Sequence, residues 1–210
     1  MSEQHTERSL TLHHHPGSRS DRPHWLLNEI GTPYTLALVN LRKGEQRSEG
    51  YAAIHPLGKV PALEIDGQII VESLAICLYL ADAFPDAQLA PPPDAGIART
   101  TYYSWMCFST GTLEPSALEE SRKWKYERRD LHYIAPGPAF TPFERVRDHL
   151  ESHLGQNAYI LGGQFSAADI LNAAVMMPMS EKGILDGFPN IKAWLDRLRA
   201  RPAFQKTFDD

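Results

Sequence analysis

Apolar and polar positions in the first third of the chain follow two different periods. Residues 9–14 and 33–41 carry apolar side chains at alternate positions, as half-buried strands do. The segment between them, "SRSDRPHWLLNEIG" at 18–31, predicts a helix, because serines can cap its start, its proline fits the first turn and a glycine ends it. The chain therefore opens with the order strand, helix, strand.

A hairpin and another helix complete this first region. The apolar runs "PALEI" and "QIIV" flank Asp66-Gly67, a dipeptide typical of two-residue hairpin turns. A short helical piece precedes them, and residues 72–85 predict a helix that follows. The opening strands require a parallel crossover, to which the hairpin adds antiparallel strands. We therefore predict an α/β domain of thioredoxin-like order, with a mixed four-stranded sheet, over residues 9–85.

The remainder of the chain predicts a second domain built only of helices. Three consecutive prolines forbid regular structure in residues 86–94, which we expect to form a linker. Every apolar pattern in residues 95–210 has a helical period. The expected helices cover residues 98–120, 138–156, 166–179 and 190–204.

One helix start in this second domain has a specific signature. Ser166 stands three residues before Asp169, at the head of a segment that is apolar nearly all round. This spacing is a variant of the capping box, in which each side chain bonds the other residue's backbone N–H. A helix of such uniform apolarity is buried, so its start needs internal caps.

Composition and charge narrow the possible functions. The formal net charge of −5 argues against a nucleic-acid groove, and no apolar run reaches the roughly 20 residues of a membrane span. Because the sequence also lacks the order of a signal peptide, we expect a cytoplasmic protein. Cys77 and Cys107 lie in apolar helical patterns without a CxxC spacing, so we expect two core cysteines and no redox motif.

Three sequence features together resemble the glutathione transferase family over nearly the whole chain. They are Val60-Pro61 before the hairpin, Glu72-Ser73 after it, and the cap formed by Ser166 and Asp169. The resemblance implies a thioredoxin-like domain that binds glutathione as co-substrate and a helical domain that lines a pocket for a small hydrophobic electrophile. It also implies a homodimer. From the residues themselves we expect no metal.

The resemblance assigns roles in glutathione binding to five residues and offers a sixth as an alternative. Pro61 would follow a cis bond that turns the Val60 backbone toward the cysteinyl backbone of glutathione, as in strand addition. Ser73, at a helix N-terminus, would hold the γ-glutamyl carboxylate, and Glu72 would pair with the α-ammonium. Lys59, or nearby His55, would meet the glycyl carboxylate.

Thiol activation needs a group that lowers a thiol pKa from about 8.5. A helix N-terminus with a hydroxyl donor does so, and residues 13–22 supply Ser18, our first choice, and Ser20. Helix capping is the alternative role of both serines. The sequence departs from the family here, because Gly17 stands where several classes keep a catalytic serine and Arg19 where another keeps a cysteine. The Arg19 guanidinium or backbone N–H is a third candidate, and an inactive binder also fits.

The electrophile is expected between the domains, against the first helix of the second one. Five side chains that suit a broad apolar pocket crowd there, of which we expect about two to line it. They are Tyr102, Tyr103, Trp105, Met106 and Phe108.

Several other functions remain open or are disfavoured. His149 and His153 share a helix face, but no third metal ligand is implied, and "GSRSD" is not a nucleophile elbow. Within the same fold, an isomerase, a dehalogenase or an ether-cleaving lyase are alternatives. So is a non-catalytic module that binds glutathione or another ligand.

Overall fold

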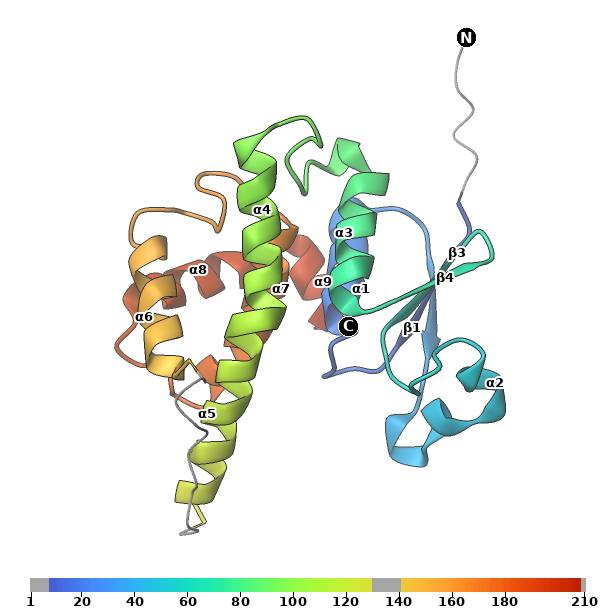
Figure 1. Cartoon of the computed structure of the whole chain (residues 1–210), viewed down its shortest axis with the longest axis horizontal. Coiled ribbons are helices and arrows are strands. Elements are labelled where there is room, and N and C mark those ends of the chain that lie inside the picture. Colours follow the sequence, from blue (N-terminus) through green and yellow to red (C-terminus); the bar gives the residue numbers. More distant parts are fainter. Residues whose placement is uncertain (1–7, 130–140, 209–210) are drawn as a thin grey trace. The chain divides into compact units, whose positions relative to one another are not determined.

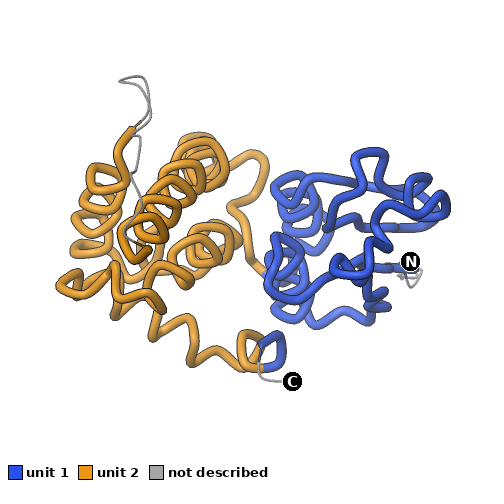
Figure 2. Tube along the Cα trace, turned by 90° about the horizontal axis from the view of Figure 1, so that it is seen from below, with its two compact units in different colours: residues 1–87, 206–210 blue, residues 88–205 orange. Residues whose placement is uncertain are grey.

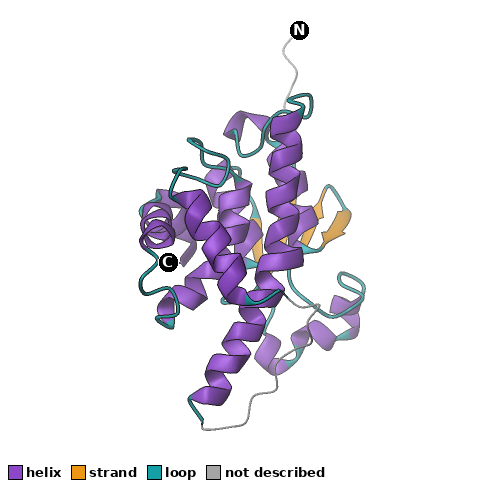
Figure 3. Ribbon diagram, turned by 60° about the vertical axis from the view of Figure 1, so that its left-hand side comes forward, coloured by secondary structure: helices purple, strands orange, loops and turns teal. Residues whose placement is uncertain are grey.

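The computed structural model describes residues 8–129 and 141–208. The chain divides into two compact units, Met1–Ala87 with Lys206–Asp210, and Gln88–Gln205 (Figure 2). The first unit is α/β and the second is helical in its described residues (Figure 3). The predicted fold class is therefore confirmed.

A mixed four-stranded sheet forms the centre of the first unit. Its order is β2-β1-β3-β4, with β2 parallel to β1 and the other neighbours antiparallel. Leu12 lies beside Leu36 on one side and Leu63 on the other. The strands are β1 (Leu10–His14), β2 (Thr35–Leu38), β3 (Ala62–Ile65) and β4 (Gln68–Val71).

Two helices, α1 (Asp21–Ile30) and α3 (Ser73–Ala83), lie side by side in this unit (Figure 1). Trp25 of α1 and Ile76 of α3 are fully buried, as is Leu12 of β1. Between β2 and β3 the chain forms the 3-10 turns η1 (Leu41–Lys43) and η2 (Glu45–Arg47) and the short helix α2 (Glu49–Ala52), and the 3-10 turn η3 (Pro85–Ala87) follows α3. Apolar side chains of the sheet and of both helices thus form the buried core of this unit.

The first helix is shorter than the sequence predicts. It begins at Asp21 rather than near Ser18, because residues 16–20 form turns closed by the Asp21 N–H to the Ser18 carbonyl, at 3.0 Å. It ends as expected at Gly31, whose φ of +75° is in the left-handed region that glycine tolerates.

The second unit contains longer helices with one irregularity. Its elements are α4 (Ile97–Phe108), the π turn η4 (Ser109–Leu113), α5 (Glu114–Glu127), α6 (Phe143–Leu154), α7 (Ala167–Glu181), α8 (Pro189–Arg199) and most of α9 (Pro202–Phe208). The predicted helix 98–120 contains the π turn, which ends two residues before Pro115, and Pro115 has no N–H for the Gly111 carbonyl. The predicted helix 190–204 is split at Pro202 for the same reason. Residues 138–140 of another predicted helix lie outside the described residues.

The predicted capping box is present at α7, a helix packed against α4, α5, α8 and η4. The Asp169 carboxylate accepts the Ser166 N–H at 2.9 Å and hydroxyl at 3.2 Å. It also accepts the Ile160 N–H at 2.8 Å and the Trp194 indole N–H at 2.9 Å. A fully buried carboxylate thus joins α7, α8 and the loop before them.

The two cysteines differ. Cys77 is buried as predicted, and burial raises the pKa of its thiol to about 12, whereas Cys107 is exposed, so the prediction was wrong for that residue. Among the described helices, none has both the length and the apolar character needed to cross a membrane.

Candidate functional site

The loop between β1 and α1 is organised by Asp21. Its carboxylate accepts the backbone N–H groups of Gly17 and Ser18. Gly17 has a φ of +74° with nothing within 4 Å of the place a Cβ would take. A serine at this position would therefore be strained by its backbone and not by lack of space, which explains why the loop's hydroxyls come from the following residues.

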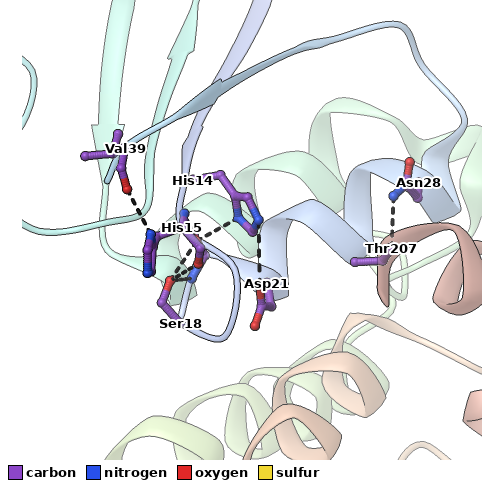
Figure 4. A network of polar contacts seen from close by, with 8 residues as sticks. His14, His15, Ser18, Asp21, Asn28, Val39 and Thr207 are labelled. Atoms are coloured by element: carbon purple, nitrogen blue, oxygen red, sulfur yellow. Dashed lines mark hydrogen bonds and ion pairs between the residues drawn. The ribbon is translucent and has the colours of Figure 1, made fainter. Parts of the chain in front are cut away.

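The two serine hydroxyls of this loop have different environments. Ser20 is fully buried, and its Oγ accepts the His15 N–H at 3.0 Å and lies 2.8 Å from His14 Nδ1. The half-buried Ser18 donates its hydroxyl to the His15 carbonyl at 2.7 Å and lies 2.8 Å from Ser20 Oγ (Figure 4). Ser20 makes no side-chain cap bond to α1, so the capping role is not observed for it. Its burial assigns it to the support of the loop and leaves Ser18 as the serine with exposed surface.

His14 connects this loop to the acid that holds it. Its Nε2 lies 3.9 Å from Asp21 Oδ1 (Figure 4). Its ring centre lies 4.7 Å from that of His24. The pKa of His14 is lowered to about 4, mainly by burial and also by the nearby His24 and His15, while a hydrogen bond with Ser20 opposes the change. Burial also raises the pKa of Asp21 to about 6, against the N–H groups of Gly17 and Ser18 and the charge of Arg22.

A second group of polar side chains gathers at the N-terminus of α3. Ser73, the first residue of the helix, is buried and accepts a hydrogen bond from Arg22 Nη1 at 3.2 Å. Glu72, which precedes it, is exposed and has a φ of +73° and a ψ of 116°. A non-glycine residue rarely adopts this backbone, and such residues concentrate at functional sites. A helix N-terminus with a buried guanidinium favours an anion.

Arg22 is the residue of this group that the sequence did not suggest. It lies on α1, fifty-one positions before Ser73, so no local spacing connects them. The sequence feature that could have indicated Arg22 is its position as an arginine on an otherwise apolar face of the first helix. A side chain of this kind is rarely buried unless it is paired.

The segment before β3 holds the remaining predicted residues. The Val60–Pro61 peptide bond is cis, Pro61 is buried and Val60 is half-buried. Lys59 is exposed, and its carbonyl accepts the Tyr51 hydroxyl at 2.8 Å. His55 is buried, and its Nδ1 accepts the Leu57 N–H at 3.2 Å. Of the two candidates for the glycyl carboxylate, Lys59 thus has the exposed side chain.

The aromatic cluster of α4 separates into core and surface. Tyr102 and Met106 are fully buried and have no exposed surface with which to line an open pocket. Trp105 and the half-buried Phe108 pack edge to face, with ring centres 5.0 Å apart, and Tyr103 is 43% exposed. Tyr103, Trp105 and Phe108 therefore remain candidates.

His149 and His153, the histidine pair of α6, both contact an aromatic side chain of this cluster. Trp105 stacks on His149, with ring centres 5.6 Å apart, and lies 4.5 Å from the His153 ring. His153 Nε2 is also 2.9 Å from the Ile160 carbonyl. The residues that the structure describes contain no group of three or more His, Cys, Asp or Glu suited to a metal ion.

Comparisons with known proteins agree with this geometry. The model of the glutathione S-transferase N-terminal domain matches residues 8–82, and that of the C-terminal domain matches residues 139–202. Glutathione S-transferase GstA of Escherichia coli is 30% identical, over 93% of this chain and 96% of that protein. The chain belongs to the glutathione S-transferase family. Two further relatives of this transferase bear on its chemistry.

The first is Protein LigF of Sphingobium sp., which is 27% identical over 92% of this chain and 90% of that protein. Its crystal structure, named as that of a beta-etherase, aligns with a TM-score of 0.78 and 25% identity over 96% of this chain and 99% of that chain. The second is a glutathione transferase homologue from Sulfitobacter with bound glutathione, which has a TM-score of 0.76 and 26% identity over 96% of this chain and 97% of that chain. The family is thus one of glutathione-dependent enzymes.

Proposed function

We propose that this glutathione S-transferase binds glutathione on its first unit and activates the thiol as a thiolate, which attacks a small hydrophobic electrophile. The observation that carries the proposal is the buried contact between Arg22 and Ser73 at the N-terminus of α3. It joins a permanent positive charge, a hydroxyl and free helix N–H groups, and together they suit a carboxylate.

The tripeptide would be held at three points. Ser73 and Arg22 take the γ-glutamyl carboxylate, and Glu72 takes the α-ammonium. The Val60 backbone, outside the ladder that begins at Ala62, pairs with the cysteinyl residue by strand addition, and Lys59 takes the glycyl carboxylate.

We place the sulfur at the loop before α1, because the strand that leads into this loop pairs with Ala62, two residues after Val60. Ser18 is our choice for the group that donates to the thiolate, because its hydroxyl is partly exposed and lies beside a helix N-terminus. Turning this hydroxyl from the His15 carbonyl to sulfur exchanges one hydrogen bond for a charge-assisted one. Arg19 is the alternative. The thiolate then forms a bond to carbon while the leaving group departs with the electron pair of the bond that breaks.

The electrophile is proposed only as a class. A beta-etherase among the relatives supports an ether-cleaving reaction as the second candidate, in which the same thiolate attack expels an oxygen leaving group. An isomerase, a dehalogenase and a non-catalytic module keep the same glutathione site. We also propose that the chain consists of a glutathione-binding domain at 9–85, a linker at 86–94 and a helical domain at 95–210. We further propose that the protein is a cytoplasmic homodimer. Gel filtration that shows only monomer would refute the dimer.

Calorimetry tests the binding site directly. Glutathione and an analogue without the γ-glutamyl α-carboxylate are titrated into the wild type, Ser73→Ala and the control Ser104→Ala, which removes an exposed hydroxyl of α4. A hydrogen bond to a charged group contributes about 1.5–3 kcal/mol, so Ser73→Ala should weaken glutathione at least about tenfold. The analogue without the carboxylate should bind the wild type and Ser73→Ala with equal affinity. An unchanged affinity for glutathione in Ser73→Ala would refute this placement of the carboxylate. In a separate activity assay with an aryl halide as electrophile, absence of turnover by the wild type would favour the non-catalytic glutathione-binding module.

A further inference from the structure

Ser18, Ser20, His14 and Asp21 form a row of polar side chains that links the β1–α1 loop to the first residue of α1. Ser18 Oγ lies 2.8 Å from Ser20 Oγ, and Ser20 Oγ lies 2.8 Å from His14 Nδ1. His14 Nε2 lies 3.9 Å from Asp21 Oδ1 (Figure 4). Ser18 and Asp21, the two ends of this chain, are partly exposed, whereas Ser20 and His14 between them are buried. Ser18 is the end that we place against the ligand.

We propose that this chain is a proton relay, which carries the proton of the glutathione thiol from Ser18 through Ser20 and His14 to the Asp21 carboxylate. The inference rests on the proposed function, because it needs a thiol at Ser18. It adds a destination for the proton, which thiolate formation by hydrogen-bond donors alone leaves to the solvent.

The order of donors and acceptors in the relay follows from their proton inventory. Each serine has one proton, and a neutral histidine has one N–H and one acceptor nitrogen. A carboxylate beside Nε2 favours the proton on that nitrogen, so Nδ1 accepts from Ser20. When glutathione binds, the Ser18 hydroxyl turns from the His15 carbonyl to donate to Ser20 Oγ, and Ser18 Oγ accepts from the thiol. Every link then points toward Asp21 before transfer.

Transfer reverses the donor and the acceptor of every hydrogen bond in the relay and moves one proton in total from the thiol to Asp21. The S–H bond breaks, each hydroxyl proton moves one position inward, Nδ1 gains a proton as Nε2 loses one, and an O–H bond forms on Asp21. His14 stays neutral at the start and the end. The reversed chain points outward, so His14 donates to Ser20, Ser20 to Ser18 and Ser18 to the thiolate. The proton's departure thus creates the donor that stabilises the product.

The environment suits the two ends of the relay. Burial, His24 and His15 lower the pKa of His14, so the ring passes a proton on and does not keep it. Burial raises the pKa of Asp21 to about 6, which makes it a better base than an ordinary aspartate, while Arg22 and the two loop N–H groups oppose this. Beyond these groups, Lys206 faces His24. The step from Nε2 to Asp21 is longer than a hydrogen bond and must shorten when glutathione binds, as catalytic contacts often do.

Stopped-flow absorbance of the thiolate tests the relay at pH 7. Asp21→Asn keeps the planar shape of the side chain and one acceptor oxygen for the loop but cannot take the proton. Ser20→Ala interrupts the chain at another link. The control is Asp94→Asn, which removes an exposed charge of the second unit. We expect thiolate formation to slow at least about tenfold in both relay variants, and added imidazole to restore the rate of Asp21→Asn.

The outcomes separate the relay from the proposed function. Wild-type rates in both variants would overturn the relay and leave thiol activation intact. A slow rate in Asp21→Asn that does not respond to imidazole would overturn it too, since it would show a structural role. If Asp21→Asn does not fold, Ser20→Ala decides by the same rate. Absence of thiolate in the wild type, despite glutathione binding, would refute the proposed function and the relay together.

Discussion

Replacing Asp169 by asparagine tests how much one buried carboxylate stabilises the second unit. Its Oδ1 accepts from Ile160 N and Trp194 Nε1, and its Oδ2 accepts from the N–H and hydroxyl of Ser166. An asparagine amide must direct its NH2 group at one of these two pairs. The less costly choice is the Ser166 side, where the hydroxyl can turn and accept, but the Ser166 N–H still loses its acceptor.

The structure sets an order of costs for three variants. A buried donor left without a partner costs about 1–3 kcal/mol. Asp169→Asn therefore costs about 2–4 kcal/mol, since it orphans one donor and weakens the charge-assisted bonds that remain. Asp169→Ala orphans three N–H groups and therefore costs about 3–9 kcal/mol. Trp194→Phe removes one donor from an acceptor that keeps another and costs about 1–2 kcal/mol.

Urea unfolding followed by circular dichroism measures these differences. Asp196→Asn serves as the control, because its exposed pair with Arg199 contributes less than about 1 kcal/mol. If Asp169→Asn were no more destabilising than Trp194→Phe, the carboxylate would not hold four donors, and the reasoning from the capping box would fail.

Three further predictions concern the first unit. Glu72→Gly should be more stable to urea than Glu72→Ala by about 1 kcal/mol, because glycine tolerates the backbone at that position and alanine does not; equal stabilities would contradict the strain. Gly58→Ala should cost at least about 2 kcal/mol, because its Cβ would lie 2.7 Å from the Gln46 carbonyl oxygen. Gly67→Ala, which also has a positive φ but has open space around its Cβ, should cost about 1 kcal/mol. Urea unfolding curves that coincide for the two variants would contradict the clash. The pKa of His14 in the folded protein is lowered from 6.5 to about 4, so its contribution to stability is present above pH 6.5 and is lost as the pH falls to 4. Over this range the stability of the wild type relative to His14→Asn should fall by about 3 kcal/mol. A constant difference would contradict the burial of a neutral ring.

Local signals in the sequence were sufficient for the features that local contacts determine. Asp66-Gly67 predicts the hairpin of β3 and β4, because the turn depends on two residues. Ser166 and Asp169 predict the start of α7 for the same reason. The period of apolar residues separates the α/β unit from the helical one.

Contacts between distant residues are what the sequence could not supply. No spacing predicts that Arg22 meets Ser73, because the meeting depends on how α1 packs beside α3. The alternation of β1 places His14 on the face of Leu12, yet its contact with Ser20 depends on the path of the loop. Likewise, an aromatic stripe does not reveal that Tyr102 is core and Tyr103 is exposed.

The measurement that tests the central claim most directly is a pH titration of the bound thiol, followed by thiolate absorbance in the ultraviolet. Wild type and Ser18→Ala are compared while saturated with glutathione. We predict that the wild type makes the thiol at least about tenfold more acidic than its free pKa of about 8.5, and that Ser18→Ala loses most of this effect. A wild-type thiol that titrates near 8.5 while fully bound would contradict thiol activation and leave a glutathione-binding module.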